Sequence, residues 1–125
     1  RFLVAGGFPP GGRATRAAVR AWGLEVVARN ESEASCAATA VLVPEDHDAD
    51  AVRALILERF DMSLGTGLGP FKGTAFRIGH LGDLNTLTLL GTLCGVEMGL
   101  RLSGVPYESG GVDAAMNLLS EDVGR

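Results

Sequence analysis

The sequence predicts an α+β domain in which a small antiparallel sheet carries helices on one face. Short strand-like segments are mixed with longer helical segments, without the strand–helix–strand repeat that builds parallel sheets. Hydrophobic residues make up 46% of the chain, which is enough for a core, and its 125 residues correspond to one domain. We place a tail or linker at residues 1–12 and the domain at residues 13–125.

The first predicted helix covers residues 14–22 and ends at Gly23, a residue suited to a helix C-terminus. The two prolines and two glycines of residues 9–12 are expected to break any regular element before it. Ala14, Ala18 and Trp22 share one face of this helix. We expect the opposite, exposed face to carry three arginines: Arg13, Arg16 and Arg20.

Two strand-like segments follow at residues 24–28 and 39–43, and Pro44 stops the second one. Asp48 is suited to cap a helix that runs to Phe60. The apolar stripe expected on this helix consists of Ala51, Val52, Leu55, Ile56 and Phe60.

The second half of the domain begins with residues 62–64, which are expected to pair briefly, and a flexible glycine-rich loop at 65–69. A third strand is predicted at residues 74–78. Asp83 or Asn85 then caps the longest helix, which runs to about Leu102. A last helix at about residues 112–119 carries its apolar face on Val112, Ala115, Met116 and Leu119.

Charge and composition exclude several partner classes. A net charge of -4 and a pI near 5.1 give no attraction to nucleic acid or to an anionic membrane. The apolar stretch at residues 87–100 is too short and mixed to span a bilayer. Cys36 and Cys94 are interpreted as reduced thiols in a cytoplasmic protein, and neither has metal-ligand spacing to His47 or His80.

The loop at residues 65–69 resembles a phosphate cradle only superficially. No Lys-Ser or Lys-Thr pair follows it and no helix begins directly after it, so a mobile loop is the better interpretation. Lys72, the single lysine of the chain, lies in the adjoining Gly/Pro-rich segment. A Schiff-base lysine requires a desolvated pocket, so a solvated loop lysine is favoured.

Arg77 is the strongest candidate for a binding residue. It lies between Phe76 and Ile78 in a predicted strand, so if these two face the core, Arg77 faces the other way. A guanidinium there can bind a carboxylate through two parallel hydrogen bonds. An exposed arginine in a surface ion pair is the alternative, and composition and spacing alone favour it.

Three further features are weighed against structural explanations. His80 and Asp83 could form an acid–base pair, although a turn in which Asp83 caps a helix is commoner. Glu97 could be a buried functional acid or part of a solvated helix face. Gly91, Gly95 and Gly99 recur every four residues on the long helix, which indicates close approach of another segment, by default the domain's own sheet rather than a partner.

Five segments in order carry a resemblance to one family. They are ATRAAVRAWGLEVVA at residues 14–28, LERFDMSLGTGLG at 57–69, FRIGHLGDLN at 76–85, LGTLCGVEMGL at 90–100 and GGVDAA at 110–115. Together they resemble the C-terminal small domain of class V, fold-type I aminotransferases that depend on pyridoxal phosphate (PLP), of the serine–glyoxylate and alanine–glyoxylate type. The resemblance implies an α+β small domain beside a large PLP-binding domain. In that family the arginine at the position of Arg77 holds the substrate carboxylate.

The resemblance does not supply a complete enzyme. The family's Schiff-base lysine, phosphate cradle and acidic partner of the pyridine nitrogen belong to the large domain, so no cofactor-binding, catalytic or metal-binding residue can be placed in this chain. Residues 1–12 do not resemble the family's chain leading into this domain.

We therefore expect a detached small domain without catalytic activity of its own, from a truncated or shuffled gene. The alternatives are part of an aminotransferase completed upstream or in trans by a PLP-domain chain, and a module that binds small carboxylates. The face that would cover the large domain is expected to drive self-association into a homo-oligomer.

Overall fold

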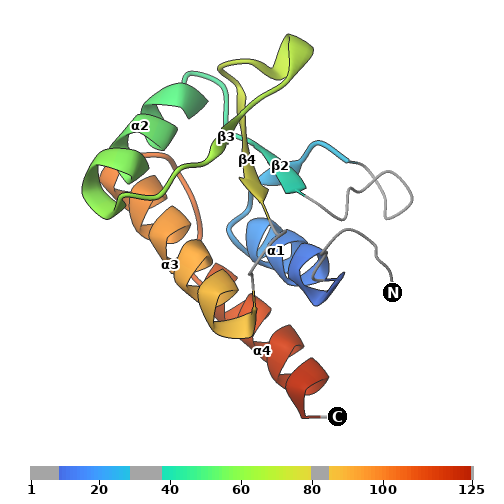
Figure 1. Cartoon of the computed structure of the whole chain (residues 1–125). Coiled ribbons are helices and arrows are strands. Elements are labelled where there is room, and N and C mark those ends of the chain that lie inside the picture. The colour runs from blue at the N-terminus through green and yellow to red at the C-terminus, as the bar shows by residue number, and fades with distance from the viewer. Residues whose placement is uncertain (1–8, 29–37, 80–84, 125) are drawn as a thin grey trace.

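Within the part of the chain that the structure describes, four helices pack on one face of a four-stranded antiparallel sheet (Figure 1). The computed structural model describes residues 9–28, 38–79 and 85–124. The predicted α+β class is confirmed. The helices are α1 Pro9–Ala21, α2 Ala49–Phe60, α3 Thr86–Leu102 and α4 Gly111–Val123, with a short 3-10 helix, η2, at Gly69–Phe71. The strands are β1 Glu25–Val26, β2 Ala38–Leu42, β3 Gly65–Thr66 and β4 Ala75–Gly79.

The sheet has the order β1-β2-β4-β3, and every neighbouring pair is antiparallel. The register places Ala40 of β2 and Gly65 of β3 on either side of Arg77 in β4. Because directly opposed residues share a face of a sheet, these three residues lie on one face. Phe76 and Ile78 alternate with Arg77 and are fully buried, so they occupy the face that the helices cover.

The core lies between the sheet and the helices. Helix α1 packs against α4 and also contacts β1 and β2, whereas α2 packs against α3, β3 and β4 (Figure 1). The largest fully buried side chains come from both layers: Val19, Trp22, Val41, Val52, Ile56, Phe76, Ile78, Leu89, Leu93, Leu100 and Leu119. Burial of these side chains is the main favourable contribution to folding.

Helix α1 begins earlier than the sequence predicts. It starts at Pro9, so residues 9–12 do not break the element but form its first turn, and the helix crosses the expected boundary between residues 12 and 13. Proline is tolerated there because the first N–H groups of a helix have no partner within the helix. Arg16 is buried, not exposed with Arg13 and Arg20, because α4 and the sheet cover more than one side of α1.

The starts of α2 and α3 follow the predicted caps. The side chain of Asp48 accepts a hydrogen bond from the backbone N–H of Asp50 at 2.9 Å. Asn85 caps α3 in a reciprocal arrangement with Thr88, and the other candidate cap, Asp83, lies outside the described residues.

The apolar stripes of two helices are narrower than predicted. On α2 the buried residues are Ala49, Val52 and Ile56, whereas Ala51 and Phe60 are exposed. On α4 Met116 is exposed and Gly111 is buried beside Ala115 and Leu119. Each helix contacts its neighbours through a thin strip, so residues at the margin of the periodic pattern reach solvent.

Side chains from α2 and from the residues just after it pack against two of the three spaced glycines of α3. A Cβ atom at Gly99 would overlap Ile56, and one at Gly95 would lie 2.9 Å from Cε of Met62. The internal contact that the spacing predicted is therefore present, but its partner is α2 and the residues after it, not the sheet. A Cβ atom at Gly91 would meet no described atom within 4 Å.

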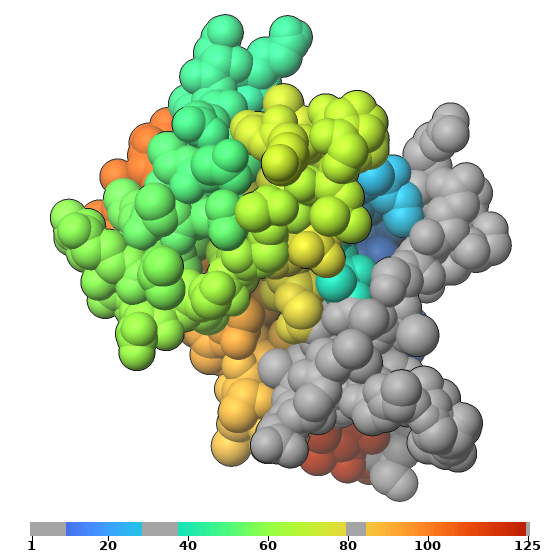
Figure 2. Space-filling view, turned by 45° about the horizontal axis from the view of Figure 1, so that its top comes forward, coloured from blue at the N-terminus to red at the C-terminus, as the bar shows by residue number. Residues whose placement is uncertain are grey.

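The glycine-rich segment is also more ordered than expected. Gly65 and Thr66 form β3, so the brief pairing predicted for residues 62–64 lies instead in the segment expected to be a flexible loop. Gly67 is buried, and a Cβ atom there would overlap the carbonyl of Phe71, so a side chain would not fit. In Figure 2 the segment from β3 to β4, in yellow-green, lies at the surface beside α2, in green.

None of the described helices is both long and apolar enough to cross a membrane.

Candidate functional site

Arg77 lies on the sheet face opposite the helices. The strand alternation that the sequence predicted is confirmed, because Phe76 and Ile78 are fully buried in the core and the half-buried Arg77 points away from it. Its neighbours across the sheet, Ala40 and Gly65, are small. The guanidinium is therefore not hidden under larger side chains on either adjacent strand.

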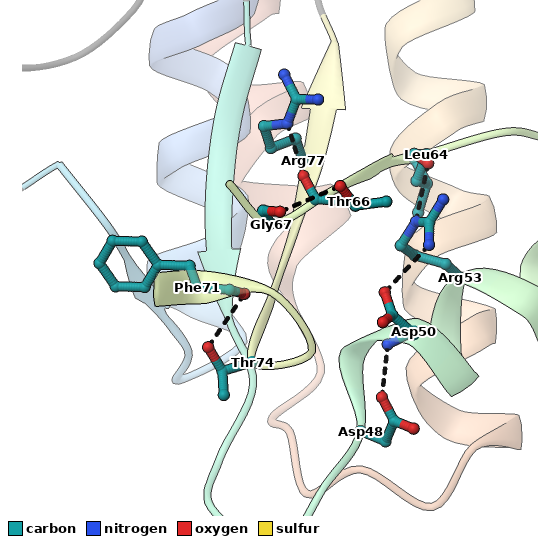
Figure 3. Close-up of polar contacts among 9 residues, drawn as sticks. All are labelled: Asp48, Asp50, Arg53, Leu64, Thr66, Gly67, Phe71, Thr74 and Arg77. Carbon is teal, nitrogen blue, oxygen red and sulfur yellow. Dashed lines mark hydrogen bonds and ion pairs between the residues drawn. The ribbon is translucent and has the colours of Figure 1, made fainter. Parts of the chain in front are cut away.

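The guanidinium of Arg77 is held by the backbone of β3. Its Nε–H donates a hydrogen bond of 2.8 Å to the carbonyl oxygen of Thr66 (Figure 3). Among the described residues no carboxylate lies within ion-pair distance of Arg77, so the surface ion pair considered above is not observed there. A half-buried cation with no acidic neighbour in the described ranges is suited to bind an external anion.

A second arginine stabilises the same strand from the other side. Arg53 of α2 donates from Nε to the carbonyl of Leu64 at 3.0 Å and from Nη1 to Asp50 at 3.1 Å (Figure 3). The backbone just before β3 is thereby attached to α2, while β3 itself is attached to Arg77. Sequence reasoning singled out neither Arg53 nor the Thr66 carbonyl, because both contacts depend on how the segment at 64–66 packs.

Lys72 does not fit the role of a Schiff-base lysine. It follows η2, its backbone N–H bonds to the carbonyl of Gly69, and its side chain is exposed to solvent. A lysine that forms an imine with PLP needs a desolvated setting and a prearranged phosphate site. As the structure places it, Lys72 is therefore not in the setting of a Schiff-base lysine.

The remaining candidates separate into two groups. His80, Asp83 and Cys36 lie outside the described residues, so the acid–base pair and the reduced state of Cys36 stay predictions. Cys94 is an exposed free thiol on α3. In the described ranges, no group of three or more His, Cys, Asp and Glu residues could hold a metal ion.

Glu97 has a structural partner that the sequence did not indicate. Its Oε1 accepts a hydrogen bond of 2.7 Å from Nε1 of Trp22, a fully buried indole 75 residues away in the chain. The half-buried carboxylate thus satisfies a donor that has no access to water. Nothing places it near Arg77, so we assign Glu97 to the core and not to the candidate site.

The sequence is similar to part of several known aminotransferases. The chain is 46% identical over 112 residues to a serine–glyoxylate aminotransferase of Methylorubrum extorquens, which covers 89% of this chain and 28% of that protein. A serine–glyoxylate aminotransferase of Arabidopsis thaliana is 45% identical over 113 residues, with coverage of 90% and 28%. The matches fall in the C-terminal part of these relatives. This chain corresponds to the C-terminal small domain of a class V aminotransferase.

The structure agrees with this assignment to the aminotransferase small domain. It superposes on the crystal structure of pyridoxamine–pyruvate aminotransferase from Mesorhizobium loti with a TM-score of 0.83 and 30% identity, over 91% of this chain and 30% of that one. No family model matches the chain. The chain spans little more than a quarter of the length of these relatives.

Proposed function

We propose that this chain is the small domain of a serine–glyoxylate-type aminotransferase whose Arg77 binds the carboxylate of a small substrate, and that it does not catalyse transamination alone. The observation that carries the proposal is the guanidinium of Arg77, held by the Thr66 carbonyl on the helix-free face and without a described acidic partner. The names of the relatives support small amino acids and glyoxylate as the substrate class.

Carboxylate binding is tested by titrating the 125-residue chain with glyoxylate or L-serine and following the side-chain N–H signals of Arg77 by NMR. We expect saturable binding with a dissociation constant on the order of millimolar, since one arginine supplies most of the attraction. Arg77→Ala should weaken it roughly 10- to 1,000-fold, because two charge-assisted hydrogen bonds disappear.

Arg77→Lys is the matched variant for this titration. It keeps the positive charge but lacks the planar pair of donors, so it should bind with an affinity between those of the wild type and Arg77→Ala. If both variants bind glyoxylate as the wild type does, Arg77 is not the carboxylate-binding residue.

The absence of independent catalysis is tested by incubating the chain with PLP, L-serine and glyoxylate and measuring glycine. No glycine above the protein-free control is expected, because Lys72 is solvent-exposed. Glycine formation that disappears in Lys72→Ala would overturn this part of the proposal.

One alternative is that the chain works as part of a complete enzyme, either with upstream sequence or with a PLP-domain chain in trans. The outward-facing Arg77 favours it, since this residue would then meet a substrate held by another domain. Replacing the equivalent part of the Methylorubrum extorquens enzyme with this chain tests the alternative. An active chimera in which Arg77→Ala raises KM would support it, and an inactive but folded chimera would oppose it.

We also propose that the chain forms a homo-oligomer and is located in the cytoplasm. Self-association is supported by exposed apolar side chains along α3: Leu87, Met98 and Leu102. The exposed free thiol of Cys94 is compatible with a reducing compartment. Thiol-labelling of the protein in intact host cells, followed by mass analysis, would show whether Cys94 is reduced there.

A further inference from the structure

Two residues of β3, Gly65 and Thr66, contact the guanidinium of Arg77. We infer that Gly65 and the backbone carbonyl of Thr66 are positioning groups that fix the guanidinium of Arg77, so that a carboxylate is bound only through Nη1 and Nη2. This inference rests on the proposed carboxylate-binding role of Arg77 and names the groups that determine its geometry.

Gly65 provides the space in which the guanidinium lies. A Cβ atom at Gly65 would be 3.0 Å from Nη2 of Arg77 and 3.1 Å from both Cζ and Nε, closer than ordinary van der Waals contact. The planar group thus lies against the backbone of its cross-strand neighbour. A methyl group at position 65 would therefore require the guanidinium to shift by a few tenths of an ångström.

The Thr66 carbonyl determines which edge of the guanidinium remains available. Arginine can bind a carboxylate through Nε and one Nη atom, or end-on through both Nη atoms. Nε–H already donates to the Thr66 oxygen at 2.8 Å, which occupies the first edge. Within the described part of the chain no hydrogen bond occupies the end-on edge, which has two parallel N–H groups. Figure 3 shows these Nη atoms directed away from the Thr66 carbonyl.

The strand that carries these groups is itself held in place. Arg53 attaches the carbonyl of Leu64 to α2, one residue before Gly65. Thr66 donates from Oγ1 to the carbonyl of Gly67 at 3.1 Å. The segment is therefore attached to α2 through Leu64 and to β4 through strand pairing, and this is the preorganisation that an oriented carboxylate clamp requires.

Gly65→Ala tests the inference with a minimal change. The backbone of Gly65 is not in the left-handed region, so alanine is conformationally acceptable there and the added methyl acts on the guanidinium. We expect Gly65→Ala to weaken glyoxylate binding at least about fivefold, as expected when a charge-assisted hydrogen bond loses its geometry. The Arg77 Nε–H signal should exchange faster with solvent, because its bond to Thr66 is disturbed.

Gly91→Ala is the control, since it adds the same methyl group at a glycine whose Cβ would meet no described atom. It should leave both the affinity and the Nε–H signal unchanged. Circular dichroism of each variant separates loss of binding from loss of fold.

The outcomes distinguish this inference from the proposed function. If wild type and Gly65→Ala bind glyoxylate equally and their Nε–H signals match, the positioning role is wrong, whereas Arg77 binding stands. If the wild type binds no glyoxylate but only Gly65→Ala loses the protected Nε–H, the positioning stands and the carboxylate role fails.

Discussion

At the residue scale, the hydrogen bond between Trp22 and Glu97 links the residue that follows α1 to α3 through the core. The indole is fully buried, and Gly111 of α4 lies against it so closely that a Cβ atom at 111 would overlap the ring. One turn after Glu97, Arg101 donates to the phenol oxygen of Tyr107 at 2.8 Å, which raises the pKa of Arg101. These contacts join α1, α3 and the segment before α4.

Removing the acceptor should destabilise the fold. Glu97→Ala leaves the buried N–H of Trp22 without a partner, and we expect the free energy of unfolding to fall by about 1–3 kcal/mol. Glu97→Gln keeps a carbonyl acceptor, so its free energy of unfolding should fall by less than that of Glu97→Ala. Urea unfolding followed by fluorescence of Trp22, the single tryptophan, measures both. Equal stability of wild type and Glu97→Ala would show that another group or water satisfies the indole.

At the element scale, α3 carries two glycines whose surroundings are opposite. Gly99 lies against Ile56, whereas Gly91 faces open space among the described residues. Gly99→Ala should lower the free energy of unfolding by about 1–3 kcal/mol through overpacking. Gly91→Ala should raise it by roughly 0.8–1 kcal/mol, because alanine is the better helix former in an exposed helix.

The double variant Gly99→Ala/Ile56→Ala tests the cause of the Gly99 effect. Truncating Ile56 opens the space that the new methyl needs, so the two substitutions should cost less together than the sum of each alone. Urea unfolding of all four proteins gives the coupling energy. If the free-energy changes of the two single variants simply add in the double variant, the methyl group at position 99 does not act through Ile56.

At the scale of the whole molecule, a line of exposed residues follows α3. Leu87, Gly91, Cys94, Met98 and Leu102 are spaced by three or four positions and share one face of the helix, the α3 stripe. Leu87 is 79% exposed and Leu102 is 51% exposed. Apolar surface of this kind favours association with a second copy.

Light scattering tests whether the α3 stripe is an interface. We expect a mass above the 13.0 kDa of one chain at micromolar concentrations. Met98→Glu together with Leu102→Glu should shift the protein to monomer. Leu68→Glu, which alters a still more exposed leucine in front of η2, should not. A monomer at every concentration would count against self-association.

Local sequence patterns were sufficient to predict the fold class and most of the helices and strands. They also predicted that Asp48 caps a helix and that Arg77 faces away from Phe76 and Ile78. The side chains of a strand alternate whatever the rest of the chain does, so Phe76 and Ile78 facing the core placed Arg77 on the other face. Recognition of the C-terminal small domain likewise needed only short motifs in order.

Tertiary structure alone decided the contacts between distant segments. The start of α1 at Pro9, the burial of Arg16, the pairing of Gly65 and Thr66 as β3 and the bond from Trp22 to Glu97 all depend on which elements pack together. The support of Arg77 by the Thr66 carbonyl belongs to the same class. A sequence pattern records how a residue relates to its near neighbours, whereas burial and hydrogen bonding are set by residues brought together only when the sheet and helices close around one core.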